Sequence, residues 1–564
     1  MFRLKNYWPF LLIILISFLA AKPLFQSGYF SMHDDLQLGR LYQLDKCLRD
    51  GQIPCRWVPD MGYGYGYPIF NFYSPFPYYL AEFFHLFRVN FIASIKIVFI
   101  LGFVLSGVFM YLLAKEFWGK IGGFVSAVFY VWLPYHAVDV YVRGALAEFW
   151  GLVWFPVVFW AVYKIVKEDK SRFIPVLAVF YSLLLLSHNL MSFFLTPAAA
   201  LWGIFLVWYL RKPWKTLIKS VLGGIWGLGL AAFFILPVIF EKKFVHIKTM
   251  FMGYFNYLAH FADLSQLFFS RFWGYGPSVW GIDDRMSFTV GPFHWIIVFV
   301  SGIIFGILWL RKKDKRFLLF TFFSLLFTFC AFLTHLRSSF LWRKISVFAY
   351  MQFPWRFLGL ATFFISFLGG SVLVLIKERK KALLLAFGLI AGVIFFNFSY
   401  FQPEEMIKIS DKEKLFSVKG WRRLQTDAIF DYLPIYAEEP PAEPAPEQPW
   451  FEKGEGEISD FKKGTDWQEF GAVVETEASV IRLPLYYFPN WRVWVDGKQV
   501  EISYDNFLGL ITFDVSKGEH KVKARLGNTP IRSLGNFLSL FSFLGIVASV
   551  VKLNNAGRNR FNRG

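Results

Sequence analysis

Apolar blocks without charged residues recur along the whole chain, separated by polar gaps. They lie at roughly 8–25, 91–114, 117–140, 146–166, 173–190, 192–210, 216–240, 288–310, 317–334, 355–376, 382–398 and 533–551. Each approaches the ~20 residues that an α-helix needs to cross a bilayer core of ~30 Å. The pattern therefore predicts an all-α polytopic membrane protein with about twelve transmembrane helices.

Lys and Arg gather at the two ends of the chain and in every second gap between the blocks. The clusters are Arg3/Lys5, Lys115/Lys120, Lys164/Lys167/Lys170/Arg172, Arg211/Lys212/Lys215/Lys219, Arg311/Lys312/Lys313/Lys315/Arg316, Lys377/Arg379/Lys380/Lys381 and Lys552/Arg558/Arg560/Arg563. Cytoplasmic loops of membrane proteins carry such an excess of positive charge. One helix fewer or more would break the alternation. The clusters thus predict a plasma (inner) membrane protein with both termini cytoplasmic.

The first block has an alternative interpretation as a cleaved signal peptide, because Arg3 and Lys5 precede an apolar run. The junction Leu19-Ala20-Ala21 is a poor match to the small-residue cleavage pattern, and we expect a retained first helix. The gaps without basic clusters must then face outward. All nine histidines lie in these outer gaps or at their edges, which indicates that the chemistry is extracytoplasmic.

The longest outer gap, 399–532, has a different pattern from the preceding transmembrane domain, 1–398. Residues 438–457 are acidic and proline-rich, which is typical of a linker. Asp496-Gly497 then stands between alternating apolar residues, a strong hairpin signal. Together with strand candidates at Leu510–Val515 and His520–Leu526, it predicts a small extracytoplasmic β-domain with a β-rich part at 470–527. A last transmembrane helix, 533–551, and a basic cytoplasmic tail, 552–564, would follow.

Composition agrees with a membrane protein, since 56% of residues are hydrophobic and 18% are charged. A soluble domain carries about 25% charged residues. The net charge of +19 would suggest nucleic-acid binding on a soluble protein, but here the basic residues separate apolar blocks. We expect the lipid bilayer as a partner, and no nucleic acid.

The first outer loop, 26–90, contains the sequence His33-Asp34-Asp35 directly after the first helix. Apolar spacing predicts two amphipathic helices later in this loop, one marked by Leu41, Leu44 and Leu48 and one at 75–87. A carboxylate at the membrane boundary can act as a general base, so Asp34 and Asp35, with His33, are catalytic candidates. The same pair could hold Mg²⁺ or Mn²⁺, the only cofactors that the sequence suggests. Alternatively, Asp34 caps the following helix.

A second group of polar residues lies at helix ends near the outer boundary. Arg143 could bind phosphate through two parallel hydrogen bonds, and Glu148 is a neighbour in the same segment. Alternatively, Asp139, Arg143 and Glu148 form a salt-bridge cluster that fixes helix packing. Arg271, Arg356 and His188 are further candidates for substrate or phosphate binding, although a lone buried histidine is more often a packing residue.

Cys47 and Cys55 lie close together in the first outer loop, and the compartment is oxidising. We predict a disulfide between them. The alternative is two buried free thiols.

Several of these stretches resemble one family of bacterial membrane proteins, labelled "6-pyruvoyl-tetrahydropterin synthase-related". They are His33-Asp34-Asp35, residues 53–79 (IPCRWVPDMGYGYGYPIFNFYSPFPYY), 141–148 (YVRGALAE), Ser187-His188-Asn189 and Pro354-Trp355-Arg356-Phe357. Residues 486–497 (YYFPNWRVWVDG) resemble the C-terminal domain of YfhO-like proteins. The acidic pair, the juxtamembrane helices and the outer domain also resemble the GT-C superfamily of membrane glycosyltransferases.

The GT-C resemblance implies a glycosyltransferase with a polyprenyl-phosphate-linked sugar donor and a cell-envelope glycan or protein as acceptor. Asp34 or Asp35 would deprotonate the acceptor hydroxyl. Arg143, with Arg356 or Arg271, would stabilise the leaving phosphate. The alternative is a non-enzymatic flippase or assembly protein for lipid-linked glycans, which would not need the acidic pair.

Overall fold

The computed structural model describes residues 7–279, 281 and 283–561, and side chains as far as Lys552. All twelve predicted apolar blocks are helical in it. The long helices are α1 (Trp8–Ala20), α5 (Phe91–Val131), α7 (Leu146–Glu168), α8 (Phe173–Ser187), α9 (Asn189–Tyr209), α10 (Thr216–Leu230), α11 (Ala232–Phe240), α13 (Pro292–Lys312), α14 (Arg316–Thr334), α16 (Leu358–Gly369), α17 (Arg379–Asn397) and α21 (Pro530–Phe561).

The number of helices that qualify as spans is smaller than predicted. By length and composition, eight helices among the described residues could cross a membrane, or nine if the bent pair α10–α11 counts as one span. Two further apolar helices, α1 and α8, are shorter than a full span. Part of the difference arises at Gly119, where the chain reverses direction. Phe91–Val142 then counts as one long span, although the sequence predicts two spans there.

Gly119 has φ +72° and interrupts α5. A Cβ on Gly123 would lie only 2.6 Å from the backbone nitrogen of Lys115. Residues eight apart in a straight helix are about 12 Å apart, so α5 must double back. Trp118 and Ser126 both donate to the carbonyl of Phe367, as expected for the two arms of a hairpin. The blocks predicted at 91–114 and 117–140 are therefore two antiparallel arms.

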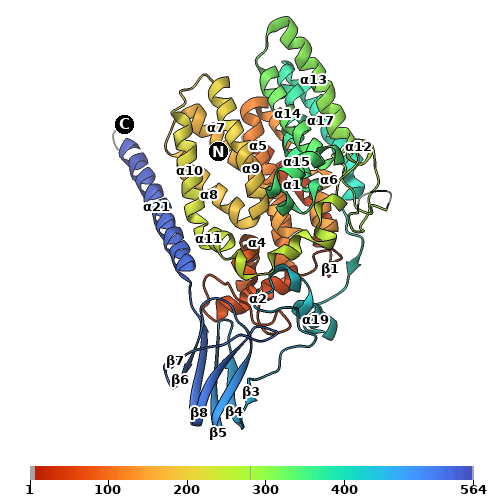
Figure 1. Cartoon of the computed structure of the whole chain (residues 1–564). Helices are drawn as coiled ribbons and strands as arrows, with labels where there is room; N and C mark the ends of the chain where they lie inside the picture. Colours follow the sequence, from red (N-terminus) through yellow and green to blue (C-terminus); the bar gives the residue numbers. More distant parts are fainter. Residues whose placement is uncertain (1–6, 280, 282, 562–564) are drawn as a thin grey trace.

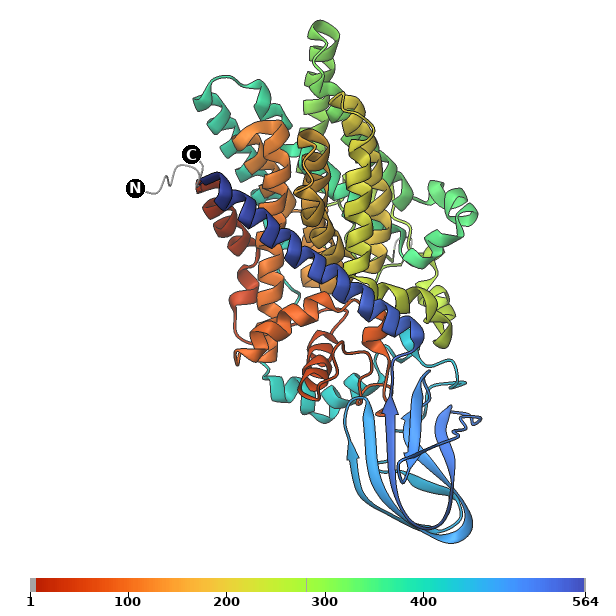
Figure 2. The same cartoon turned by 90° about the vertical axis from the view of Figure 1, so that its left-hand side faces the viewer.

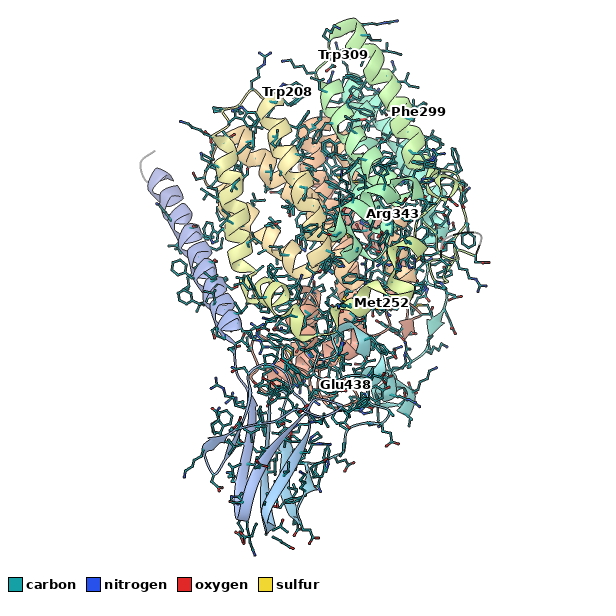
Figure 3. The ribbon with its side chains drawn as sticks, viewed as in Figure 1. Trp208, Met252, Phe299, Trp309, Arg343 and Glu438 are labelled. Carbon is teal, nitrogen blue, oxygen red and sulfur yellow. A yellow bond between two sulfur atoms is a disulfide. The ribbon has the colours of Figure 1, made fainter. Side chains whose placement is uncertain are left out.

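The outward faces of the helices carry large apolar side chains. Phe299 on α13 is 64% exposed and points away from the bundle (Figure 3). Phe387 on α17 and Phe541 on α21 are exposed to a similar degree. Such a surface suits contact with lipid rather than water. The start of α1 and the end of α21 lie at the same end of the bundle, opposite the β-domain (Figure 2).

The first outer loop forms the two predicted surface helices, α2 (Gln37–Arg49) and α4 (Phe76–Leu86), with the short α3 (Ile69–Phe72) between them. The leucines at positions 41 and 44 of α2 are fully buried. A disulfide joins Cys47 to Cys55, whose Cα atoms are 5.6 Å apart. These helices lie between the bundle and the β-domain, beside α19 (Val418–Thr426) (Figure 1).

The C-terminal outer region contains a six-stranded antiparallel sheet of β3 (Trp450–Lys453), β4 (Gly456–Lys463), β5 (Trp467–Tyr486), β6 (Trp491–Val495), β7 (Lys498–Val500) and β8 (Leu510–Leu526). The strand order is β3-β5-β8-β6-β7, with β4 also paired to β5. The Asp496-Gly497 turn joins β6 to β7 as predicted. The two strands predicted after it form one long strand, β8. Strands begin at Trp450, so the linker is shorter than the predicted 438–457, and α21 extends beyond the predicted 533–551.

The glycine- and tyrosine-rich loop of residues 62–67 packs against this β-domain. The carbonyl of Tyr65 accepts from the backbone N–H of Tyr486, and their rings lie 5.2 Å apart. At the other end of β5, the Asp50 carboxylate accepts from Thr465 and from the Trp467 indole. Both ends of the long strand β5 thus contact the first outer loop, which requires the strand to bend back.

Candidate functional site

The acidic motif lies beside the segment that contains Arg143. The backbone N–H groups of His33 and Asp34 donate to the carbonyls of Val142 and Arg143, over 3.0 and 2.9 Å. Gly144 permits this approach, since its φ is +62° and a Cβ there would lie 2.3 Å from the sulfur of Met32. The residues before it form a π-helical turn, Val138–Val142, a feature frequent at functional sites. Two predicted site segments, more than a hundred residues apart in sequence, therefore meet.

The carboxylate of Asp34 is held by one of its oxygens. Oδ2 accepts from Arg40 at 2.7 Å and from the Gln37 amide at 3.0 Å. Among the described residues, no hydrogen bond reaches Oδ1, and the side chain is 32% exposed. Asp34 is therefore partly open to solvent, with one oxygen that accepts no hydrogen bond from the described residues.

The alternative role of Asp34 as a helix cap is not observed. The N-cap of α2 is Leu36, and no side chain caps its first turn. Asp34 lies two residues further out and contacts the helix only through Gln37 and Arg40.

Asp35 points to a different part of the molecule. Its Oδ2 accepts from Lys414 and from Arg423, the latter at 2.7 Å. These cations belong to α18 (Asp411–Phe416) and α19, and the Asp35 side chain is only 11% exposed. Asp35 thus fastens the C-terminal outer segment to the first loop.

His33 makes its ring contact with backbone rather than with either aspartate. Its Nε2 lies 2.7 Å from the carbonyl oxygen of Tyr275. This contact joins the acidic motif to the outer loop before α13 and favours a positioning role over the predicted catalytic one.

Arg143 lies at the centre of a buried ion-pair cluster. Its guanidinium donates to Asp139 and, at 2.7 Å, to Glu148, both of which are almost fully buried. The guanidinium also lies 4.5 Å from the ring centroid of Trp355. Glu148 accepts in addition from the Tyr135 hydroxyl. The structure therefore has the salt-bridge cluster of the alternative interpretation, in which both terminal nitrogens of Arg143 are bonded to carboxylates.

Arg356 and His188 border the same cluster. Arg356 lies 3.3 Å from Glu148 and donates to the carbonyl of Met351. His188 is the N-cap of α9, where its Nδ1 accepts from the backbone N–H of Met191. The cluster therefore pairs two arginines with two carboxylates, and His188 has a structural use that explains its place in the turn.

Arg271 does not join this cluster. It is exposed, its guanidinium lies 5.4 Å from the ring centroid of Phe396, and it donates to that residue's carbonyl. Periodicity alone could not separate it from Arg143, because both lie in outer gaps.

The residues fit a divalent cation poorly. Arg40 neutralises Asp34, while Lys414 and Arg423 neutralise Asp35, so the pair offers no concentrated negative charge. Within the described residues, no group of three His, Cys, Asp or Glu side chains is arranged to hold a metal. The predicted Mg²⁺ or Mn²⁺ site at Asp34 and Asp35 therefore lacks the ligands it would need.

Sequence reasoning missed two side chains beside Asp34. Burial lowers the pKa of Arg40, but Asp34 with Tyr73 and Tyr78 outweighs this and raises that pKa above its usual value. Burial also raises the pKa of Asp431 to about 6, with Arg40 opposing and Asp34 adding to the shift. A charged residue on the buried face of α2 was a possible signal for Arg40. Nothing local marks Asp431, which arrives from a distant segment.

An apolar groove of about 510 Å³ opens on the side of the bundle between α13 and α14. Phe268, Trp295, Phe299, Ile303 and Phe320 are among its lining residues. Its outer end is close to the site, because Leu267, next to Phe268, accepts from the N–H of Val290. Phe288 in that segment stacks on Trp355, which lies over Arg143.

Comparison with known proteins places most of the membrane domain in one family. A model of the family described as "6-pyruvoyl-tetrahydropterin synthase related domain; membrane protein" matches residues 70–402. An uncharacterized protein of Lactococcus lactis subsp. cremoris is 22% identical over 339 residues, which cover 57% of this chain. The chain spans about half (53%) of that relative's length.

Among solved structures, similar chains include the oligosaccharyltransferase of Archaeoglobus fulgidus and the arabinofuranosyltransferase AftD from Mycobacteria. The first has a TM-score of 0.42 and 12% identity, over 79% of this chain and 61% of that one. The second has a TM-score of 0.47 and 14% identity, over 72% of this chain and 28% of that one.

Proposed function

The chain belongs to the family of 6-pyruvoyl-tetrahydropterin synthase related membrane proteins, and from this premise we propose that it is a membrane glycosyltransferase. It moves a sugar from a polyprenyl-phosphate donor to a cell-envelope acceptor on the extracytoplasmic face of the plasma membrane. One observation carries the proposal. Asp34 is fixed through Oδ2 and through its backbone, yet Oδ1 remains available at the outer surface.

In this reaction Asp34 acts as the general base. Oδ1 takes the proton of the acceptor hydroxyl while the hydroxyl oxygen attacks the anomeric carbon of the donor. The bond from that carbon to the phosphate oxygen breaks, and the phosphate leaves with the electron pair. Arg40 and Gln37 hold Oδ2, so the carboxylate need not reorient during the step.

Arg143 acts as a positioning residue rather than a phosphate ligand. Its carbonyl accepts the N–H of Asp34, and its own side chain is locked by Asp139 and Glu148. The buried cluster therefore anchors the backbone that carries the base, and it does so without leaving a cation free for the leaving group.

The apolar groove beside α13 suits the hydrocarbon part of a lipid donor. It is lined almost wholly by apolar side chains and opens toward the lipid-facing surface. Arg271 follows Phe268 by three residues and is exposed, so it is the cation best placed to meet a phosphate at the outer end of the groove.

We infer the sidedness from the basic clusters, which support a cytoplasmic location for both termini and an outer location for residues 399–532. The position of the α1 start and the α21 end on one side of the bundle supports an even number of crossings (Figure 2).

The test is a transfer assay with the full chain in membranes, a polyprenyl-phosphate sugar and capture of the glycosylated product. Asp34→Asn, which is nearly isosteric, should reduce the rate by roughly 10²–10⁴-fold without changing the amount of folded protein. Asp283→Asn, in an outer loop, is the matched control and should leave the rate unchanged. Full activity of Asp34→Asn would reject the assignment.

A non-enzymatic flippase or assembly protein is the second candidate. The use of Asp35 Oδ2 to hold Lys414 and Arg423 supports it, since this class does not need the acidic pair as a base. This class predicts that a lipid-linked glycan moves across the membrane of reconstituted vesicles and that no sugar is transferred to an acceptor. If Asp34→Asn leaves this transport unchanged and no sugar transfer is detected, the protein belongs to this class.

A further inference from the structure

Two arginines face each other on neighbouring strands at one end of the β-domain. Arg492 on β6 is the direct cross-strand partner of Arg525 on β8. Like charges in this position repel each other. Within the described residues, no salt bridge neutralises either guanidinium, whereas Lys523 on the same face is paired with Glu469. The carboxylates of Asp50 and Asp466 are near enough to sense the charge of Arg525 without pairing with it.

The two arginines line a cavity of about 270 Å³. Asn490, Trp494 and the turn Leu526–Asn528 complete its wall. The Asn490 amide donates to the carbonyl of Asn528, and its oxygen accepts from Arg492, so this end of the cavity is held in place. The cavity thus combines two cations, an indole ring and fixed polar groups, a set that suits an anion attached to a larger molecule.

The position of the cavity along the chain gives its depth relative to the membrane. Asn528 precedes by two residues Pro530, at which the apolar helix α21 begins. Two residues extend by at most about 7 Å, so the Asn528 end of the cavity is close to the headgroup layer, which is of similar thickness. Arg525 precedes Pro530 by five residues, and the arginines therefore lie toward the side of the cavity that is further from the membrane core. β6 and the end of β8 lie directly below the start of α21 (Figure 1).

We propose that this cavity binds the phosphate of an anionic phospholipid headgroup, and so fixes the β-domain on the membrane surface. The facing arginines provide a fork of donors for the phosphate oxygens, and the bound charge removes their mutual repulsion. The glycosyltransferase proposal is not required for this site.

The experiment measures binding of soluble short-chain phosphatidylglycerol to the purified full chain in detergent. Arg492→Gln combined with Arg525→Gln should weaken binding by about tenfold or more, because charge-assisted hydrogen bonds are lost. Lys498→Gln combined with Lys517→Gln removes the same charge from exposed positions of the domain and should leave binding unchanged. Equal binding by the two double variants, or equal weakening in both, would overturn the proposal.

Two further probes separate the sources of phosphate and guard against misfolding. Short-chain phosphatidylcholine and a simple sugar phosphate should bind at least several-fold more weakly than phosphatidylglycerol. Tighter binding of the sugar phosphate would overturn the assignment to a lipid. Arg492→Lys with Arg525→Lys keeps the charge and the fold but loses the planar fork, and it should fall between the wild type and the glutamine variant.

Discussion

The buried cluster around Arg143 and the acidic motif at Asp34 lie side by side, but they differ in how far their charged groups are paired and buried. In the cluster, two arginines and two carboxylates pair with one another and are almost closed to solvent. At the motif, Asp34 has one partner cation and remains 32% exposed. A charge that is buried must be compensated, whereas a charge that reacts must keep an accessible atom. This difference supports our proposal that the cluster has a structural role and that Asp34 is the general base.

The largest effect should come from breaking the cluster. Arg143→Met leaves Asp139 buried without its cation, which typically costs roughly 3–5 kcal/mol. We expect loss of monodisperse protein on mild heating, measured by size-exclusion chromatography in detergent. Adding Asp139→Asn should restore part of the stability, because it removes the unpaired charge. A stable, well-folded Arg143→Met variant would show that the ion-pair cluster is not needed for stability, and it would contradict the structural role given to the cluster.

A smaller effect is expected at the other aspartate. Asp35→Asn removes the carboxylate shared by Lys414 and Arg423 and should weaken the attachment of α18 and α19 by roughly 1.5–3 kcal/mol. Limited proteolysis should cut residues 411–426 faster, while the transfer rate stays within a few-fold. Asp427→Asn, which removes a more exposed partner of the same arginine, is the control. A loss of rate as large as that of Asp34→Asn would make the two aspartates equivalent.

A buried acid on α4, Glu82, provides a pH-dependent test of how burial affects a charge. Burial, together with the nearby Asp45, raises the pKa of Glu82 on α4 to about 8, with Arg49 opposing. The folded state then holds a proton that the unfolded chain releases near its ordinary pKa of 4.5. Stability should therefore fall as pH rises from about 4.5 to about 8 and level off above that. Thermal stability of Glu82→Gln, followed across this range, should lack this slope.

The smallest effect concerns donor binding at an exposed cation. Arg271→Gln should raise the KM for a polyprenyl-phosphate sugar by roughly 2- to 5-fold without changing stability, as is typical of exposed charges. Arg337→Gln, another exposed arginine of the outer loops, should have no effect. An unchanged KM for both variants would remove Arg271 from the donor site.

Much of the architecture could be predicted because bilayer insertion imposes a local rule. Every apolar block became helical, and the surface helices and the β6–β7 turn lie where periodicity placed them. The reversal at Gly119 also occurs in the predicted gap. The extent of the β-domain was harder to predict. Strands β3 and β4 contain too many charged residues to show a clear alternation of apolar and polar positions.

The candidate site was only partly predictable. The sequence marked Asp34, Arg143, Glu148 and Arg356 as chemically notable, and the structure brings them into one neighbourhood. It could not distinguish Asp34 from Asp35, since the difference lies in their partners: Asp34 pairs with the nearby Arg40, whereas Asp35 pairs with Lys414 and Arg423 from a distant segment.

Length, hydropathy and charge act locally along the chain, so the amino-acid sequence is sufficient to predict a helical membrane protein with a C-terminal β-domain. Which charged side chains are neutralised by a partner, and which keep an accessible atom, follows in large part from the packing of the folded chain. Arg143 pairs with Asp139 and Glu148 of its own segment, but the approach of Arg356 to Glu148 and the pairing of Asp35 with Lys414 and Arg423 depend on how separate helices and loops pack. Burial and these long-range ion pairs are properties of that packing, and no single segment contains the information that sets them.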